Sequence, residues 1–367
     1  MIKLFIFEGV YKLTEMLKMI ALKKIFFLLI VISSISCKKN TEIKVLFGNE
    51  DFIKENLIIS KIDSLKTEKE IEKFVRSIDT TYSKFRLRKY EHFSFLGIQD
   101  SLTLEFYKKL KFNHKYQKAD LDNNGFTDLL VIGDDNNCYT GNDKTSCSFT
   151  PLVIMNFNGS YKLETINLVS HSKIIPKIEY FNNQAFLSVF KMTQVEYKVF
   201  EEEKVILTYK FGGFIEYNNN PKKYDINKFK FSTNGCFGIC PVFELSICKD
   251  SISTFRAIEY NFSDCGFFDI KSKEEQLSRK DEGVFYQYIS KKDFNSLIEI
   301  LNYIEIDALK DHYNVWHTCD QTGILVVKYN NNKIKVIEDY GMVGTYGMKL
   351  FYDKLLDFRF DKNWEKQ

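Results

Sequence analysis

Apolar residues are densest near the N-terminus, where Ile25–Ile35 is an almost wholly apolar stretch of eleven residues. A helix of that length covers about 16 Å, whereas the hydrocarbon core of a bilayer is about 30 Å thick. Lys23 and Lys24 precede the stretch, and small residues follow it up to Cys37. A basic segment, a short apolar segment and small residues in this order are typical of an export signal, not of a spanning helix.

Further along the chain, apolar positions recur first at helical and then at strand spacing. Ile71, Phe74, Val75 and Ile78 lie at helical spacing and predict a helix over Ser64–Ile78. Apolar runs separated by Asn/Gly turns then predict five strands, at Leu129–Ile132, Leu152–Phe157, Tyr161–Leu168, Ala185–Phe190 and Val195–Tyr209.

A second series of elements follows the polar stretch Tyr217–Lys223. Its clearest helix is Ser290–Tyr303, where Ser290 and Asp293 form a capping-box pattern ahead of apolar residues at helical spacing. The other predicted elements are strands at Lys228–Phe231 and Val242–Cys248, a hairpin of Ile324–Tyr329 and Lys333–Ile337 joined by three asparagines, and a helix at Lys349–Phe358. This order of strands, helix, hairpin and helix predicts an α+β fold and not a doubly wound sheet.

These patterns predict five segments. They are an over-extended start plus signal peptide (1–36), a lipidated cysteine and tether (37–45), a β-rich domain (46–217), a linker (218–227) and a smaller α+β domain (228–362). The start is interpreted as over-extended because the mixed charges of Met1–Lys18 do not fit an export signal. Met16 or Met19 is therefore the expected initiator.

Composition and charge exclude several classes of protein. With 44% apolar residues over 367 residues, the chain is neither globally disordered nor a multi-span membrane protein. Its net charge of +3 resides entirely in residues 1–36, because the rest of the chain has 47 basic and 47 acidic residues. Only six basic residues are Arg, the side chain whose planar fork suits phosphate and guanine recognition. We therefore expect no nucleic-acid partner.

The end of the signal segment reads Ser34-Ile35-Ser36-Cys37 and resembles the lipobox of bacterial lipoproteins, in the serine-rich form of Bacteroidota-type bacteria. In that family the signal is cut before the cysteine, whose thiol carries a diacylglycerol. The resemblance implies that Cys37 is the lipidation site, and two acyl chains make such anchoring stable. No acidic run typical of surface export follows Cys37. We therefore expect a lipid anchor in the outer membrane that faces the periplasm.

The sharpest motif is Asp120-Leu121-Asp122-Asn123-Asn124-Gly125-Phe126-Thr127-Asp128. Oxygen-bearing side chains at positions 1, 3, 5 and 9 and a glycine at position 6 suit the oxygen coordination of Ca²⁺. Because a strand follows at once, the motif resembles the calcium loop of FG-GAP repeats in integrin-type propellers, in a single copy. The resemblance implies a structural calcium ion held by Asp120, Asp122, Asn124, the carbonyl of Phe126 and Asp128. The alternative is an Asx-rich turn without a metal, since Val131 replaces the glutamate of an EF-hand.

Eight cysteines in an exported chain predict disulfides. Cys138 and Cys147 flank a polar loop and are predicted to form a bridge at a hairpin tip. Cys236 and Cys240 admit three interpretations: a local disulfide before the next strand, a zinc site completed by His317 or Cys319, or a copper site similar to that of Sco-type chaperones. The strand predicted after Pro241 disfavours the thioredoxin fold of those chaperones, and a redox-active pair normally begins a helix.

The segment Gly235-Cys236-Phe237-Gly238-Ile239-Cys240-Pro241 also resembles the hallmark of family 6438 of the domains of unknown function, which occurs in bacterial envelope proteins. The resemblance covers residues 229–357 and continues through Gly283-Val284-Phe285-Tyr286, Tyr313 and Asp320. No activity is known for this family, so the resemblance implies architecture and not chemistry.

Signatures of catalysis are missing from the sequence, which has no Gly-x-Ser-x-Gly, His-Glu-x-x-His, Walker-type or Gly-x-Gly-x-x-Gly motif. We expect no enzyme and no cofactor apart from a structural calcium ion. The expected function is a binding or structural module of the cell envelope, attached to the membrane by its lipid, with an unknown protein, peptide or glycan partner. The alternative is a thiol- or metal-dependent (Cu/Zn) envelope factor that uses Cys236 and Cys240.

Overall fold

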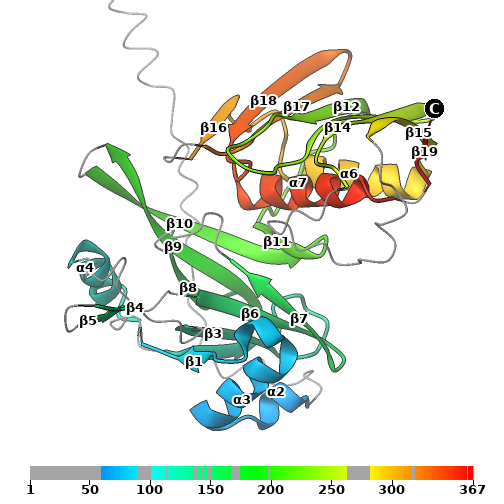
Figure 1. Ribbon diagram of the computed structural model, residues 1–367. Coiled ribbons are helices and arrows are strands. Elements are labelled where there is room, and N and C mark those ends of the chain that lie inside the picture. Colours follow the sequence, from blue (N-terminus) through cyan, green and yellow to red (C-terminus); the bar gives the residue numbers. More distant parts are fainter. Residues whose placement is uncertain are drawn as a thin grey trace, which may run out of the picture. The chain divides into compact units, whose positions relative to one another are not determined.

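The structure is a computed structural model (Figure 1). It describes residues 59–89, 101–112, 114–134, 139–141, 144–146, 150–166, 174–196, 199–262, 282–315, 319–361 and 363–366. The signal segment, Cys37, Cys138, Cys147 and His317 lie outside the described residues. None of the described helices is long and apolar enough to cross a membrane.

The first sheet of the described chain has five strands. Its strands are β1 (Arg86–Leu87), β2 (Tyr116–Ala119), β3 (Asp128–Asp134), β6 (Thr150–Phe157) and β7 (Ser160–Thr165), with β3 between β6 and the strands β1 and β2. The helices α2 (Lys61–Ser64) and α3 (Glu68–Ile78) share a buried apolar cluster with this sheet. The prediction of one helix over Ser64–Ile78 is wrong at its start. The helix α2 ends at Ser64, and α3 begins after Thr67, which forms a capping box with Glu70.

A four-stranded antiparallel sheet follows, formed by β8 (Ile174–Phe181), β9 (Gln184–Glu196), β10 (Val199–Lys210) and β11 (Gly213–Glu216). The prediction of one strand over Val195–Tyr209 is wrong, because β9 extends to Glu196 and β10 begins at Val199. The shorter elements of this part of the chain are η2 (Thr80–Tyr82), α4 (Ser101–Lys109) and the paired strands β4 (Tyr139–Gly141) and β5 (Lys144–Ser146).

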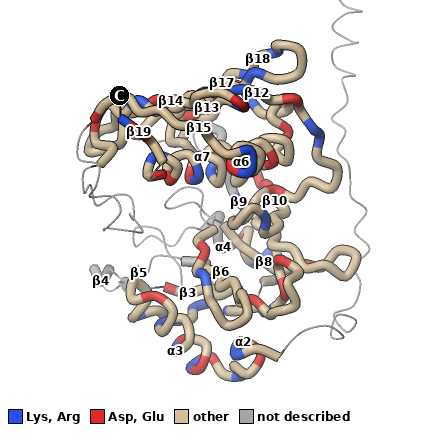
Figure 2. Tube along the Cα trace, turned by 90° about the vertical axis from the view of Figure 1, so that its right-hand side faces the viewer, with Lys and Arg blue, Asp and Glu red and all other residues tan. Residues whose placement is uncertain are grey.

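The third sheet has eight strands in the order β16-β18-β17-β12-β13-β14-β15-β19. Their bounds are β12 (Ile226–Thr233), β13 (Val242–Cys248), β14 (Ile252–Glu259), β15 (Gly283–Tyr288), β16 (His312–Asn314), β17 (Thr322–Tyr329), β18 (Lys333–Tyr340) and β19 (Glu365–Lys366). The helices α6 (Lys291–Tyr303) and α7 (Tyr346–Phe358) lie together on one side of this sheet, as Figure 2 shows from a second direction. The chain is therefore rich in strands, with few helices and several sheets, as the expected α+β class requires.

Several local predictions for this sheet and its helices are confirmed. Ser290 accepts the backbone N–H of Asp293 at 3.1 Å and begins α6. The hairpin of β17 and β18 turns at Asn330, Asn331 and Asn332, all with left-handed backbone torsions that asparagine tolerates well. The last helix starts earlier than predicted, at Tyr346, because Thr345 accepts the N–H of Met348 at 3.2 Å.

The predicted division into two domains at residues 218–227 is not confirmed. Residues 47–367 form one compact unit. The backbone N–H of Asn218 donates to the Tyr303 hydroxyl at 3.0 Å, and Lys222 lies 3.0 Å from Glu305. The carboxylate of Glu216, at the end of β11, accepts the first N–H groups of α7 from Tyr346 at 2.6 Å and Gly347 at 2.9 Å. The four-stranded sheet is thereby joined to the helical side of the eight-stranded sheet.

Candidate functional site

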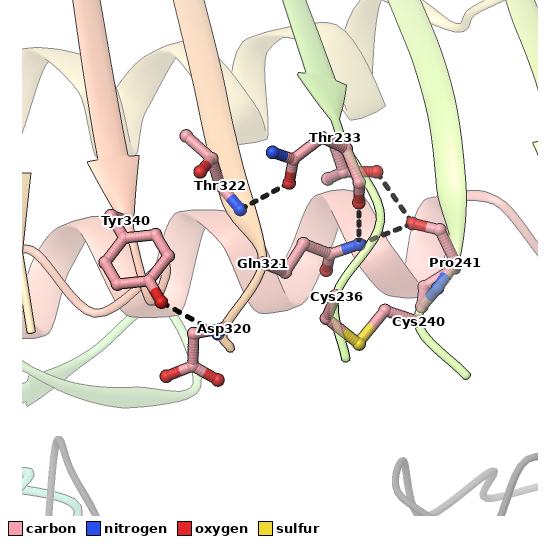
Figure 3. Close-up of a disulfide and its surroundings, with 9 residues drawn as sticks. Thr233, Cys236, Cys240, Pro241, Asp320, Gln321, Thr322 and Tyr340 are labelled. Atoms are coloured by element: carbon pink, nitrogen blue, oxygen red, sulfur yellow. Dashed lines mark hydrogen bonds between the residues drawn. A yellow bond between two sulfur atoms is a disulfide. The ribbon is translucent and has the colours of Figure 1, made fainter. Parts of the chain in front are cut away.

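The cysteine motif lies at one end of the eight-stranded sheet, in the loop between β12 and β13 (Figure 3). Cys236 and Cys240 form a disulfide with their Cα atoms 5.8 Å apart. Of the three interpretations of this pair, the structure has the local disulfide. We refer to Asn234–Pro241 as the disulfide loop and to this end of the sheet as the disulfide end.

Hydrogen bonds from buried polar side chains hold the disulfide loop in place. Thr233 donates its hydroxyl to the carbonyl of Pro241 at 2.7 Å and accepts the N–H of Phe243 at 3.2 Å. The side-chain amide of Gln321 donates to the carbonyls of Asn234 at 2.7 Å and Pro241 at 2.8 Å, so one side chain joins both ends of the loop (Figure 3). The role of Gln321 could not be predicted from the sequence, because no local pattern connects this residue to a loop eighty residues earlier.

The backbone segment that precedes β17, at Cys319 and Asp320, lies next to the same loop. The N–H of Phe237 donates to the carbonyl of Cys319 at 3.1 Å. The N–H of Asp320 donates to the hydroxyl of Tyr340, at the end of β18, at 3.0 Å (Figure 3). The backbone of Cys319 therefore lies against the disulfide loop, while His317, the other residue suggested for a joint metal site, lies outside the described residues.

Strand register brings the scattered motif residues to the disulfide end. Phe243 pairs with Ala257, which pairs with Gly283 at the start of β15. Tyr313 of β16 and Gly323 of β17 both pair with Asp339 near the end of β18. Residues that are separated by up to a hundred positions in the chain therefore lie at the same level of one sheet.

Two apolar side chains of the disulfide loop point into solvent. Phe237 is 88% exposed and Ile239 is 45% exposed. Because so little of its surface is buried, the side chain of Phe237 contributes little to the stability of the fold. The disulfide and Gln321 restrict the loop that carries it. The loop therefore presents a large apolar group in a defined position.

A carboxyl group is buried close to this end of the sheet. Asp339 is fully buried, and neither of its carboxylate oxygens has a hydrogen-bond partner of good geometry. Burial raises the pKa of Asp339, although the N–H groups of Val343 and Gly344 and the Tyr352 hydroxyl face it and act in the opposite direction. A Cβ atom at Gly344, whose φ is +32°, would lie 2.7 Å from a carboxylate oxygen of Asp339, so this position favours glycine.

The calcium-type loop, between β2 and β3, brings three predicted ligands together. Asp120, Asp122 and Asp128 each offer a carboxylate oxygen within 4.8 Å of the others. The Gly125 N–H donates to Asp120 at 2.8 Å, and Asn123 and Gly125 have left-handed torsions that make the tight turn. The chain therefore folds this motif into a compact group of oxygens, the donor type that Ca²⁺ prefers.

The side chain of Asn124, another predicted ligand, forms hydrogen bonds within the loop. Asn124 donates its side-chain amide to Asp122 at 3.0 Å, and its side-chain oxygen accepts the N–H of Phe126 at 2.8 Å. Asp128 has a structural role that the sequence did not indicate. Its two oxygens accept the N–H of Leu121 and the N–H of Asn156, both at 2.7 Å, so that it joins the loop to β6.

The three carboxylates also repel one another electrostatically. Burial, with the neighbouring charge of Asp120, raises the pKa of Asp122 to about 6. Burial, with the charges of Asp122 and Asp120, raises the pKa of Asp128 to about 7. A bound divalent cation would offset this repulsion, since opposite charge favours the ionised form of a carboxyl group. The donor set therefore fits a hard cation such as Ca²⁺.

Comparison with known families agrees with the resemblance noted in the sequence. Residues 227–359 match the family described as Domain of unknown function (DUF6438). The match runs from the start of β12 to the residue after α7, so it includes the disulfide loop and Asp339 but not the calcium-type loop. No curated protein and no solved structure gives a significant match.

The raised pKa of Asp339 gives a testable pH dependence. The folded state keeps this proton at pH values where the unfolded state has lost it, so the contribution of Asp339 to stability falls as pH rises above about 4. Asp339→Asn cannot ionise. We therefore expect its melting temperature, relative to that of the unmodified chain, to rise between pH 5 and pH 8. Asp353→Asn, at a half-exposed carboxyl on α7, should show no such trend. An equal loss of stability at both pH values would contradict this prediction.

Calcium should stabilise the unmodified chain through Asp122. A ligand at a hundred times its dissociation constant stabilises the folded state by about 2.7 kcal/mol. We expect Ca²⁺ to raise the melting temperature, and Asp122→Asn to remove most of that rise while changing little in the presence of a chelator. Asp79→Asn, an exposed helix cap elsewhere, serves as the matched control. A melting temperature that does not respond to millimolar Ca²⁺ would dismiss the site.

Proposed function

We propose that this chain is a lipid-anchored binding module of the cell envelope and that the disulfide loop is its recognition surface. The proposal rests above all on Phe237, an aromatic side chain that is 88% exposed on a loop whose two cysteines are joined. It is supported by the export-type N-terminal segment that ends at Cys37 and by a disulfide, a bond that persists in oxidising compartments.

Physical reasons favour binding through this loop. Aromatic side chains dominate the energetics of many protein interfaces and lose little conformational entropy when they bind. A loop that is already ordered adds little further entropic cost on association. The disulfide loop is ordered by its covalent bond and by the bonds of Gln321 and Thr233 to Pro241. We propose a protein, peptide or glycan with an apolar surface as its partner, and no catalytic role.

The calcium-type loop has a separate, structural role in this proposal. A cation bound by Asp120, Asp122 and Asp128 would hold the start of β3 against β6, where Asp128 already joins the two strands. The ion would stabilise the β-rich part of the chain without taking part in recognition.

The lipid anchor is tested by metabolic labelling. We expect cells that express the full chain to incorporate an alkyne-labelled fatty acid into it and to retain it in the membrane fraction. Cys37→Ser should abolish both, because the thiol that carries the lipid is lost. Cys319→Ser, at an exposed cysteine of the described structure, is the control and should be labelled normally. Labelling that survives Cys37→Ser would contradict the assignment.

Recognition by the loop is tested by site-specific photocrosslinking in the cells that naturally make the protein. A photoreactive residue at position 237 should give discrete adducts, whereas one at Phe157, which is 38% exposed on β6, should give none. The adducts should disappear when Cys236→Ser and Cys240→Ser are combined, since the loop then loses its defined shape. Adducts that are equal at both positions would refute recognition by this loop.

The thiol- or metal-dependent alternative has one observation in its favour, the contact of Phe237 with the carbonyl of Cys319, which brings a third cysteine next to the pair. The sulfur atoms of Cys236 and Cys240 are bonded to each other, so both would have to be reduced before they could coordinate Cu or Zn. A stoichiometric transition metal on the purified chain that is lost in Cys236→Ser would favour this alternative. Fully oxidised protein without such a metal would favour the binding module.

A further inference from the structure

The eight-stranded sheet has one face that no other described element covers. The helices α6 and α7 lie on the opposite face (Figure 1). We call the uncovered side the open face. Its residues alternate along the strands with buried ones such as Phe229 and Phe231 of β12 and Leu325 of β17. The side chains of the open face therefore point away from the core.

Strand register arranges the open face in rows that run across the strands from β18 to β15. One row consists of Val336, Val326, Lys230, Ser246, Thr254 and Tyr286. The adjacent row, farther from the disulfide loop, includes Ile334, Lys328, Lys228, Ile252 and Tyr288. We call the residues of these two rows the lysine patch. Its only charged residues are the three lysines.

The lysines of the patch lie close to one another and far from carboxylates. Lys228 pairs directly with Lys328, and Lys230 follows two residues along β12, an arrangement of like charges that destabilises a sheet. Among the described residues, no carboxylate lies within 4 Å of these lysines. On the edge strand β19, Glu365 continues the row of Lys230 but lies four strands away from it. The turns beyond the patch add two basic and two acidic residues: Lys249, Lys333, Asp225 and Asp250.

The next row of the open face, toward the disulfide loop, carries both signs of charge. It contains Glu338, Glu244 and Arg256. Each carboxylate already has a basic neighbour in the same chain, since Glu244 lies 3.8 Å from Arg256 and Glu338 lies 3.6 Å from His312. The uncompensated positive charge of the open face is therefore confined to the end away from the disulfide loop.

Apolar side chains flank the lysines on both sides. A solvated face of an antiparallel sheet normally carries polar residues. Here, between 47% and 72% of the surface of four large apolar side chains is exposed: Ile334 and Val336 on β18, Ile252 on β14 and Tyr288 on β15. The patch therefore combines positive charge at its centre with exposed apolar surface at its flanks.

We propose that the lysine patch docks on an anionic phospholipid bilayer. Lipid phosphates supply the negative charge that the fold does not place beside the three lysines, and each lysine near such a surface adds to its attraction. Lysine stems lie along apolar surface while their ammonium groups reach the headgroups. Ile334 and Val336 then contact the boundary of the acyl chains, a level at which tyrosines such as Tyr288 are also favoured.

The length of the chain before the described residues favours a bilayer over an acidic protein. Residues 38–58 join Cys37 to Ile59, the first described residue, and a chain of this length spans at most about 75 Å. A lipid on Cys37 would thus keep the open face near the membrane at a high effective concentration. The inference goes beyond the recognition role of the disulfide loop. The proposed anchor strengthens the docking but is not required for it.

Docking through the lysine patch also sets the direction of the disulfide loop. Along β12, Lys228 lies about 17 Å from Thr233, where the loop begins. Lipid phosphates attract the lysines and repel Glu338 and Glu244 in the row between, so the sheet tilts with its lysine end toward the bilayer. Phe237 is then held away from the membrane, where a partner can reach it.

Vesicle binding with a local probe tests this inference. The full chain would carry an environment-sensitive fluorescent amino acid at position 334 and meet vesicles of phosphatidylcholine, alone or mixed with phosphatidylglycerol. We expect a blue shift only with phosphatidylglycerol, and its reversal in about 0.5 M NaCl, because salt screens the attraction. The same probe in place of Phe157 or Phe237 should not respond. Because the signal is local, it reports the open face whichever segment attaches the chain.

Charge reversal separates the lysine patch from other lysines. Lys228→Glu, Lys230→Glu and Lys328→Glu combined should lower binding to phosphatidylglycerol vesicles at least about tenfold and abolish the shift at position 334. Circular dichroism should remain unchanged. The matched control reverses three exposed lysines on α3 and α6 and should keep the shift: Lys69, Lys73 and Lys292.

Three results would overturn the proposal. They are an unmodified chain that does not distinguish the two kinds of vesicle, an equal loss of binding in the two triple variants, or a shift at position 237 in place of position 334. A photoreactive residue at position 334 that gives a discrete protein adduct in cells, without any response to phosphatidylglycerol, would show a protein occupant and also refute it. Crosslinking from position 237 has a separate readout, so recognition by the disulfide loop and docking on lipid can fail independently.

Discussion

The C-terminal part of this protein depends on an aromatic layer buried between the eight-stranded sheet and its two helices. Phe231 of β12 stacks on Tyr352 of α7 with ring centroids 5.2 Å apart, and Phe229 lies 5.6 Å from Phe351. Burying each such side chain contributes about 1.5–3 kcal/mol, an upper estimate because the unfolded chain is already partly compact. Because β12 is central, these contacts set the position of the strands on both sides of it.

The geometry of the disulfide end depends on that aromatic layer. Side chains on a strand alternate between its faces, so a shift by one residue would expose the buried phenylalanines, and the register is strongly determined. Thr233 and Gly323 therefore come to the same level of the sheet, so that Thr233 and the nearby Gln321 can join the loop. The Cys236–Cys240 bond closes only a short loop and so restricts the unfolded chain little. Its main effect is on the shape of the loop that carries Phe237.

The distribution of charge shows why local arrangement matters more than net charge. After residues 1–36 the chain has equal numbers of acidic and basic residues, which gives no reason to expect an anionic partner. Yet the folded chain gathers three carboxylates in the calcium-type loop and opposes two lysines across β12 and β17. The repulsion among the three carboxylates costs free energy, which a bound cation would offset.

Several features could be predicted from the sequence because they are encoded within a few residues. The Ser290–Asp293 cap, the Asn330–Asn332 turn, the strand Val242–Cys248, the local disulfide and the gathering of Asp120, Asp122 and Asp128 all depend on neighbours in the chain. Only the tertiary structure determined that Gln321 joins both ends of the disulfide loop, that Asp128 holds Asn156 and that the carboxyl group of Asp339 is fully buried. These contacts connect residues far apart in the chain, and they form only when all the strands have adopted their register together.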